Sequence, residues 1–240
     1  MMQIYLIEQI KEDLIFQLSE EDAHHCTVVM RNRIGDVIWG TDGKGNAYQL
    51  EIINIQKKTV FAKQINHYPQ LGEPKLETCI AFALLKNSSR MEMIIEKAVE
   101  LGATHIYPFV AKRSEKKSVS LERLQKIAIA AIKQCKRSKI PEIQCFNSFQ
   151  TLISENKKWK IPKFLGYCEA KTYISHFQEQ ISQNPSFFII GPEGDFTPEE
   201  IEFAIENHIH IFLLGNTRFR AETAGIHLLS INYYLKNFSN

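Results

Sequence analysis

The chain has 240 residues, of which 44% are hydrophobic, and its formal net charge is only +2. This length and composition suit one large globular domain or two smaller ones, and no apolar run reaches the roughly 20 residues that span a bilayer. The first residues also lack the pattern of a secretory signal, so we expect a cytoplasmic protein with no membrane partner.

Five cysteines are scattered along the chain, with no CxxC pair and no histidine at ligand spacing: Cys26, Cys79, Cys135, Cys145 and Cys168. This pattern predicts neither a disulfide framework nor a metal site. We expect all five to be buried thiols in a reducing compartment.

Residues 1–70 are predicted to form a small β-barrel. Ser19 is placed to begin a helix over residues 20–30, and DGKGN at 42–46 predicts a hairpin turn. Closure into a barrel would remove free strand edges. The prolines and glycine of 67–75 predict a linker. The segments rich in β-branched and aromatic residues, which we predict to be strands, are 3–7, 14–18, 37–39, 47–55 and 59–65.

Residues 76–240 change to an alternation of apolar strands and amphipathic helices, which predicts an α/β domain with a parallel sheet. A capping box from Ser89 to Glu92 begins one helix, and Gly102 ends it. Ligands of such sheets bind beyond the carboxyl ends of the strands, so function is expected in the loops that follow them. The predicted strands are 79–85, 105–109, 163–168, 187–190 and 209–214.

Positive charge is concentrated in one segment. Residues 112–139 contain ten basic and two acidic residues, a net charge of +8, so the rest of the chain carries −6. Apolar residues repeat at helical spacing over 121–135, which puts many of the lysines and arginines on the exposed face. Such a segment suits a polyphosphate partner such as RNA, although a solvated helix face explains the charge alone equally well.

The first chemistry-bearing loop follows the strand at 187–190 and reads GPEGDF at 191–196. Gly191 and Gly194 allow the backbone to approach a ligand closely. Thr197 then caps a helix, with Pro198 in its first position and Glu200 completing a capping box. A turn glycine alone would be unremarkable, but the whole string fixes a strand, a turn and a helix start.

The second loop follows the strand at 209–214 and reads LGN at 214–216, then RAETA at 220–224. It again joins a strand to a helix through a glycine. Two arginines and a glutamate lie within five residues, at 218–222, beside a buried strand. This density favours a binding site, although an arginine and a glutamate that brace the loop would also account for it.

Together these motifs resemble those of the SPOUT-class RNA methyltransferases of the RsmE type, which methylate N3 of a uridine in 16S rRNA. GPEGDF is similar to the signature GPEGGF, and RAETA to the end of LGxRILRxETA; QCKR at 134–137 and Pro141 resemble a further conserved segment. The barrel resembles that family's PUA-like domain. The chain departs from the family pattern at Asp195, Thr217, Arg218, Phe219 and Gln3.

The resemblance implies a SPOUT domain over 76–240 with a deep trefoil knot, a PUA-like RNA-binding barrel over 1–70, and a homodimer. The cofactor would be S-adenosylmethionine, and the partner 16S rRNA within the small ribosomal subunit. The residues expected to bind the cofactor are Leu84, Gly191, Pro192, Glu193, Gly194, Leu214, Gly215, Arg220, Thr223 and Ala224.

Uracil N3 becomes nucleophilic only after its proton is lost, which builds negative charge on the flanking carbonyl oxygens. A guanidinium stabilises such an anion, and Arg220 is expected to do so, with Glu222 orienting it. Glu193, Asp195 and bulk water remain open as the proton acceptor. The residues expected to bind RNA are Arg31, Arg33, Arg113, Lys133, Lys136 and Arg137.

Two other functions share parts of this pattern. One is a SPOUT methyltransferase that acts on tRNA or on a ribose 2′-hydroxyl, and the other is a noncatalytic RNA-binding factor of the ribosome. Dehydrogenases and nucleotide hydrolases are disfavoured, because neither GxGxxG after a strand nor GxxxxGK[ST] occurs.

Overall fold

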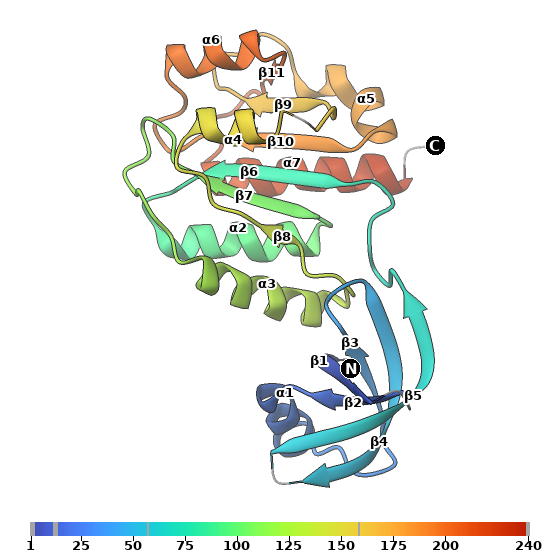
Figure 1. The fold of residues 1–240 in the computed structure, drawn as a ribbon. Coiled ribbons are helices and arrows are strands. Elements are labelled where there is room, and N and C mark those ends of the chain that lie inside the picture. Colours follow the sequence, from blue (N-terminus) through green and yellow to red (C-terminus); the bar gives the residue numbers. More distant parts are fainter. Residues whose placement is uncertain (1–2, 12–13, 57, 158, 239–240) are drawn as a thin grey trace. The chain divides into compact units, whose positions relative to one another are not determined.

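The computed structural model describes residues 3–11, 14–56, 58–157 and 159–238. Its contacts divide the chain into two compact units (Figure 1). One comprises Met1–Glu73 and Ile129–Ile140, and the other Pro74–Ala128 and Pro141–Asn240. Each unit has a hydrophobic core of its own.

The first unit contains a closed barrel, as the sequence predicts. Its interior is filled by large side chains such as Tyr5, Phe16 and Leu50, all at most 2% exposed. A parallel pairing of the first and third strands closes the barrel, and the other neighbours are antiparallel. The strand order is β1-β2-β5-β4-β3, with bounds β1 (Ile4–Lys11), β2 (Ile15–Leu18), β3 (Val37–Thr41), β4 (Asn46–Gln56) and β5 (Thr59–Pro69).

Local signals in the barrel act as predicted, with two differences. Ser19 caps α1 (Glu20–His24), and the backbone N–H of Asn46 donates to the Asp42 carboxylate within the hairpin turn. The expected helix over 20–30 continues after α1 as a π-helix, η1 (His25–Val29), rather than as α-helix. Strand β5 runs to Pro69, into the segment expected to be a linker.

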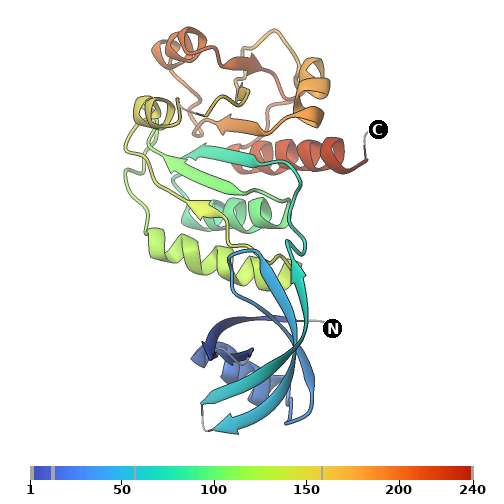
Figure 2. The ribbon, with the colours of Figure 1, turned by 45° about the vertical axis from the view of Figure 1, so that its right-hand side comes forward.

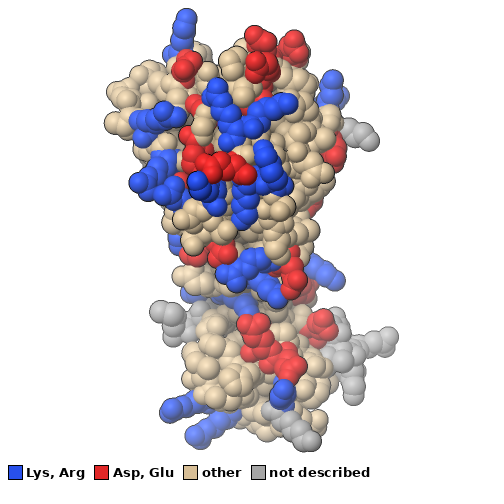
Figure 3. Space-filling model, turned by 90° about the vertical axis from the view of Figure 1, so that its left-hand side faces the viewer, with Lys and Arg blue, Asp and Glu red and all other residues tan. Residues whose placement is uncertain are grey.

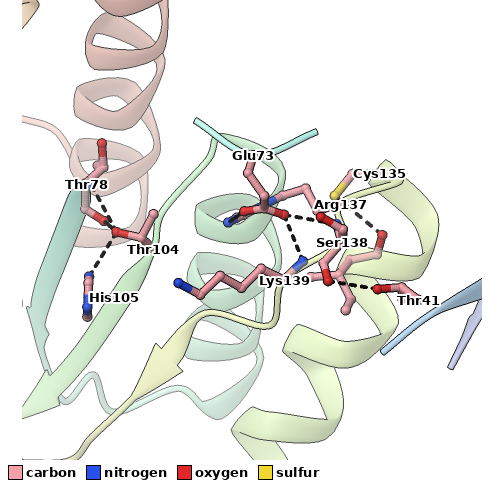
Figure 4. A network of polar contacts seen from close by, with 10 residues as sticks. Thr41, Glu73, Thr78, Thr104, His105, Cys135, Arg137, Ser138 and Lys139 are labelled. Carbon is pink, nitrogen blue, oxygen red and sulfur yellow. Dashed lines mark hydrogen bonds and ion pairs between the residues drawn. The ribbon is translucent and has the colours of Figure 1, made fainter. Parts of the chain in front are cut away.

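The segment that follows helix α3 (Leu121–Cys135) is fastened to the barrel by one buried carboxylate (Figure 4). The Glu73 carboxylate accepts from Arg137 Nη2 at 2.7 Å and from the backbone N–H groups of Ser138 and Lys139 at 3.0 and 2.8 Å. Thr41 Oγ1 donates to the Ser138 carbonyl at 2.8 Å. Because Glu73 and Arg137 are 4% and 3% exposed, the pair is closed to solvent.

The second unit is an α/β fold with an all-parallel sheet, which confirms the predicted class. The sheet order is β11-β9-β10-β6-β7-β8, with bounds β6 (Thr78–Ala83), β7 (His105–Phe109), β8 (Glu142–Ile143), β9 (Lys163–Gly166), β10 (Ser186–Ile190) and β11 (His210–Phe212). The helices besides α3 are α2 (Ser88–Glu100), α4 (Phe149–Glu155), α5 (Gln178–Gln183, after the 3-10 turn η2, Ile174–Phe177), α6 (Pro198–Glu206) and α7 (Ala221–Phe238). The trefoil knot stays a prediction.

Helices cover both faces of this sheet (Figure 2). One face packs against α4 and α6 in a core that includes Phe149, Leu152 and Ala204. Helices α2, α5 and α7 form a second layer, in which α7 contacts both of the others and strand β10. Strands β6 and β10 at the centre of the sheet are buried at every position, as expected of a strand covered on both faces.

Three sequence expectations need correction here. Helix α2 is capped by Asn87, whose Oδ1 accepts from the backbone N–H groups of Ser89 and Arg90, and not by a box starting at Ser89. Cys145 and Cys168 are exposed and Cys135 is half-buried, so only two of the five cysteines, Cys26 and Cys79, are buried as expected. The apolar segment expected to be a strand over 209–214 pairs only at His210–Phe212. Over the described ranges, no helix is long and apolar enough to cross a membrane.

Candidate active site

A cavity of about 540 Å³ lies where strands β9, β10 and β11 end. This volume is in the range of small-molecule sites. Its lining comes from the loops after these three strands, from the start of α7 and from Arg90 of α2. The cavity therefore lies beyond the carboxyl ends of parallel strands, where the sequence places function.

The loop after β10 is held in shape by the helix that follows it. Thr197 and Glu200 form the predicted capping box at the start of α6, and the second Glu200 oxygen, Oε1, accepts from the Lys112 N–H at 2.9 Å. Arg113 Nη1 donates to the carbonyls of Gly194 and Phe196 at 2.8 and 3.2 Å. These bonds fix the turn that carries GPEGDF before any ligand arrives.

Close packing explains the glycine at the end of β10. A Cβ atom added to Gly191 would lie 2.9 Å from Cε2 of Phe196, which is 1% exposed and locked in the core. A similar atom on Gly215, in the loop after β11, would lie 3.2 Å from Cε2 of Phe219. Both glycines leave backbone accessible on the cavity side, since Gly191 and Gly215 line it.

The two predicted glycine turns share one cavity, but they do not follow adjacent strands. Strand β9 lies between β10 and β11, so a third loop contributes Gly166, Tyr167 and Cys168 to the lining. The Tyr167 N–H donates to the Phe212 carbonyl, which ties this loop to the end of β11. The strand predicted over 163–168 ends in the structure at Gly166, so that glycine was the available sequence signal for this third loop.

The ten predicted cofactor residues divide into two groups. Those that line the cavity are Gly191, Pro192, Glu193, Leu214, Gly215, Arg220 and Ala224. Leu84, Gly194 and Thr223 are not part of its lining. Leu84 is 3% exposed, with its N–H bonded to the Phe109 carbonyl, and the Gly194 carbonyl is occupied by Arg113.

The arginine of the site that contacts Glu222 is Arg90 and not Arg220. Arg90 Nε lies 3.4 Å from Oε1 of Glu222, whose side chain is 6% exposed. Between Arg220 and Glu222, both in the described part of the chain, no hydrogen bond or ion pair occurs. Arg220 is exposed and lines the cavity, and the expected orienting role of Glu222 toward it stays a prediction.

Acidic and thiol groups of the cavity are not arranged as a nucleophile or a metal site. Glu193 Oε1 accepts from the Lys86 N–H, and Asp195 Oδ2 accepts from the Cys168 N–H. Desolvation, and then Asp195, raise the pKa of the Cys168 thiol, so it stays protonated near neutral pH. Among the described residues, no group of three or more His, Cys, Asp or Glu could hold a metal ion.

The residues expected to bind RNA have very different surroundings. Arg31, Arg33 and Lys136 are exposed. Lys133 forms a 2.7 Å ion pair with the buried carboxylate of Asp22, and Arg137 is enclosed with Glu73. These placements argue against phosphate contacts by Lys133 and Arg137, because both cations already neutralise buried carboxylates.

Basic side chains gather on the face of the second unit toward which the arrows of β6 and β9 point in Figure 1. Figure 3 shows that face, with Lys and Arg surrounding a smaller group of acidic side chains in the upper part of the view. The cavity itself is lined by Arg90, Arg218 and Arg220 against Glu193 and Asp195. Three cations against two carboxylates favour an anionic ligand.

Comparison with known proteins decides the family. Residues 72–232 match the family model of the RNA methyltransferase domain, and residues 18–65 match that of the RNA methyltransferase PUA domain. The chain is 32% identical to ribosomal RNA small subunit methyltransferase E of Bacillus subtilis, over 97% of this chain and 96% of that protein. The chain belongs to the ribosomal RNA small subunit methyltransferase E family.

A second relative and a solved structure agree with this assignment. The Mesomycoplasma hyopneumoniae protein of the same name is 36% identical over 66% of this chain and 70% of its own length. A methyltransferase from Legionella pneumophila, solved with bound S-adenosylmethionine, is 27% identical with a TM-score of 0.82, and 97% of each chain is covered. The resemblance drawn from GPEGDF and RAETA is thus confirmed, and the chain is an RNA methyltransferase.

Proposed function

We propose that this enzyme transfers a methyl group from S-adenosylmethionine to N3 of a uridine in 16S rRNA of the small ribosomal subunit. The observation that carries the proposal is the cavity at the ends of β9, β10 and β11, which unites the GPEGDF turn with Arg220 of RAETA. The barrel over 1–70 would be the RNA-binding domain and residues 76–240 the methyltransferase domain.

The residues of the cavity fit S-adenosylmethionine. Ile190, Leu213 and Leu214 offer an apolar wall for the adenine, and the glycine turns at 191 and 215 offer backbone groups at close approach. Glu193 offers a carboxylate to the ammonium of the methionine part. When bound, the cofactor supplies an activated methyl group on a sulfonium, so the protein's main task is alignment.

The chain's own residues would prepare the acceptor. Arg220 lines the cavity at its rim, and its guanidinium stays protonated while negative charge builds on the uracil oxygens. Both oxygens of Asp195 already accept backbone N–H groups, which holds this carboxylate in the turn. We infer that the N3 proton leaves to water once the arginine stabilises the anion.

Exposed cations would hold the RNA backbone. The proposed phosphate contacts are Arg31 and Arg33 on the barrel and Lys136 after α3. Arg113 would contact the RNA as well as the GPEGDF loop. Replacing Arg31, Arg33 and Lys136 by glutamine should weaken RNA binding and reduce the slope of log affinity against log salt by about 3. An unchanged slope, with cofactor affinity intact, would contradict these contacts.

A homodimer is the proposed assembly. Helix α7 exposes Tyr233, Tyr234 and Phe238, which are 42%, 61% and 65% exposed. Aromatic side chains on one helix favour burial against a second copy, and a two-fold axis is the commonest arrangement. Sedimentation of the wild type and of Tyr234→Lys should give a dimer and a monomer respectively, and a monomeric wild type would contradict the proposal.

The deciding experiment supplies labelled S-adenosylmethionine and the full chain to small ribosomal subunits, to naked 16S rRNA and to tRNA. Mapping of the product nucleoside should find N3-methyluridine in 16S rRNA. Methylated tRNA or a 2′-O-methyl ribose would favour the alternative activity, methylation of tRNA or of a ribose 2′-hydroxyl. Cofactor binding without transfer to any substrate would refute this substrate assignment. The substrates are cytoplasmic, which is the compartment we propose.

A further inference from the structure

The contact between Arg90 and Glu222 is unexplained by the roles given so far. Arg90 is the third residue of α2 and lines the cavity, and its side chain is 34% exposed. Its Nε faces Glu222, and no side-chain hydrogen bond among the described residues involves its two Nη groups. The Nε side of the Arg90 guanidinium therefore faces a carboxylate, and the two Nη groups can donate hydrogen bonds to a ligand.

Glu222 is also incompletely satisfied. Its side chain is 6% exposed, and Oε2 is buried without a hydrogen-bond partner in the described part of the chain. A buried carboxylate oxygen left unpaired costs free energy, so its presence beside the cavity calls for an explanation. A modest closing of the 3.4 Å contact would give a two-point pair, with Nε and one Nη on the two Glu222 oxygens. Contacts of this kind are often long before substrate binds.

The geometry of the acceptor requires donors on both sides of N3. The uracil anion carries its charge on the two carbonyl oxygens that flank N3, and its lone pair points between them. One guanidinium lying across both oxygens would occupy the path of the incoming methyl group. Stabilising both oxygens therefore needs two separate donors, one on each outer flank. The cavity offers cations from two different elements, Arg220 before α7 and Arg90 on α2.

We propose that Arg90 is a second substrate-contacting arginine, which stabilises the uracil oxygen opposite the one served by Arg220, and that Glu222 is its positioning residue. This inference rests on the proposed uridine N3 methylation. The charged groups around Arg90 are Glu222 on α7, Arg218 and Arg220 before that helix, and Glu193 and Asp195 after β10. The buried carboxylate gives Arg90 a fixed orientation, which an exposed rim arginine lacks.

The test compares Arg90→Gln, Arg90→Lys and Glu222→Gln with the wild type, and uses Lys97→Gln as the matched control. Lys97 lies on the same helix and is ion-paired to Glu96 and Glu100, outside the cavity lining. The full chain is assayed on RNA at saturating S-adenosylmethionine, with kcat and KM measured across pH. Cofactor affinity is measured by calorimetry, and folding by thermal melting.

We expect Arg90→Gln to lower kcat by about a hundredfold, as loss of one donor to a developing anion does elsewhere, with cofactor affinity and RNA KM nearly unchanged. Its kcat should keep rising with pH beyond the wild-type plateau, because a less stabilised uracil anion forms at higher pH. Arg90→Lys should lose about tenfold, since one point charge remains. Glu222→Gln should lose less than Arg90→Gln and add nothing to it in the double variant, whereas Lys97→Gln should match the wild type.

A wild-type kcat and pH profile in Arg90→Gln would overturn the proposal, as would a loss of cofactor affinity with kcat unchanged. If Arg90→Gln does not fold, the pH profile of Arg90→Lys decides in the same way. An additive loss in the double variant would overturn the positioning role of Glu222. Absence of methylation by the wild type would instead refute the proposed function, so the two failures are distinguishable.

Discussion

Replacing Glu73 by alanine should destabilise the first unit strongly. Glu73 and Arg137 are 4% and 3% exposed, and the substitution leaves the guanidinium enclosed without its carboxylate. Breaking a buried pair from one side costs about 3 to 5 kcal/mol. The Ser138 N–H, in a fully buried residue, also loses its acceptor, at about 1 to 3 kcal/mol. Because these losses overlap, we expect about 5 kcal/mol in total, a large share of the stability of a typical protein.

The assay is urea unfolding followed by circular dichroism, with amide exchange at Ser138 as a local probe. Glu20→Ala is the matched control, since Glu20 forms an ion pair with Lys58 that is exposed on both sides and should leave the transition unchanged. The double variant Glu73→Leu, Arg137→Met should recover most of the loss, because an apolar pair removes both buried charges. A loss below about 1 kcal/mol in Glu73→Ala would refute the reasoning.

Two further substitutions test other parts of the second unit. Burial lowers the pKa of Lys236 from 10.5 to about 8, so between these pH values the unfolded chain binds one more proton than the folded chain. The free energy of unfolding of the wild type should therefore rise with pH by about 3 kcal/mol relative to Lys236→Met. Parallel curves of stability against pH for the two proteins would contradict this. Gly191→Ala should reduce S-adenosylmethionine affinity at least about tenfold in calorimetry, because its Cβ would collide with Phe196, and unchanged affinity would exclude Gly191 from the site.

Sequence reasoning succeeded where the signal is local. The Thr197 and Glu200 capping box and the Asp42 hairpin turn depend on side-chain bonds to nearby backbone, and such bonds form in any context that leaves the ends free. Continuous apolar residues likewise predict buried strands such as β10. The position of the cavity could be predicted because its lining comes from loops that follow such strands.

Elements stabilised by distant contacts were missed. Helix α4 has only seven residues, and its order depends on packing of Phe149, Leu152 and Ile153 into the core rather than on a long periodic pattern. Strand β8 has two residues, and β7 is its one partner among the strands that the structure describes. The burial of Arg137 and Lys133 could not be read from their charge, because Glu73 and Asp22 are far away in sequence.

Arg90 was missed for the same reason. In the sequence it is one basic residue at the start of an amphipathic helix, more than a hundred positions from the RAETA motif. Only the packing of α2 against α7 brings it to Glu222 and to the cavity. A motif names the residues that are close along the chain, whereas the chemistry of a site also needs partners that the fold supplies.

The departure from the family signature at Asp195 has a structural explanation. The backbone there adopts φ +59°, a left-handed conformation that glycine enters freely and that aspartate tolerates better than most residues. Its carboxylate offsets the cost, because Oδ1 accepts from the Phe196 N–H at 2.9 Å and Oδ2 from the Cys168 N–H at 3.2 Å. The second bond joins the turn after β10 to the loop after β9. In this turn, hydrogen bonds of the aspartate side chain thus stabilise a conformation that glycine would adopt freely. The bond to Cys168 also holds the loop after β9, which lines the cavity.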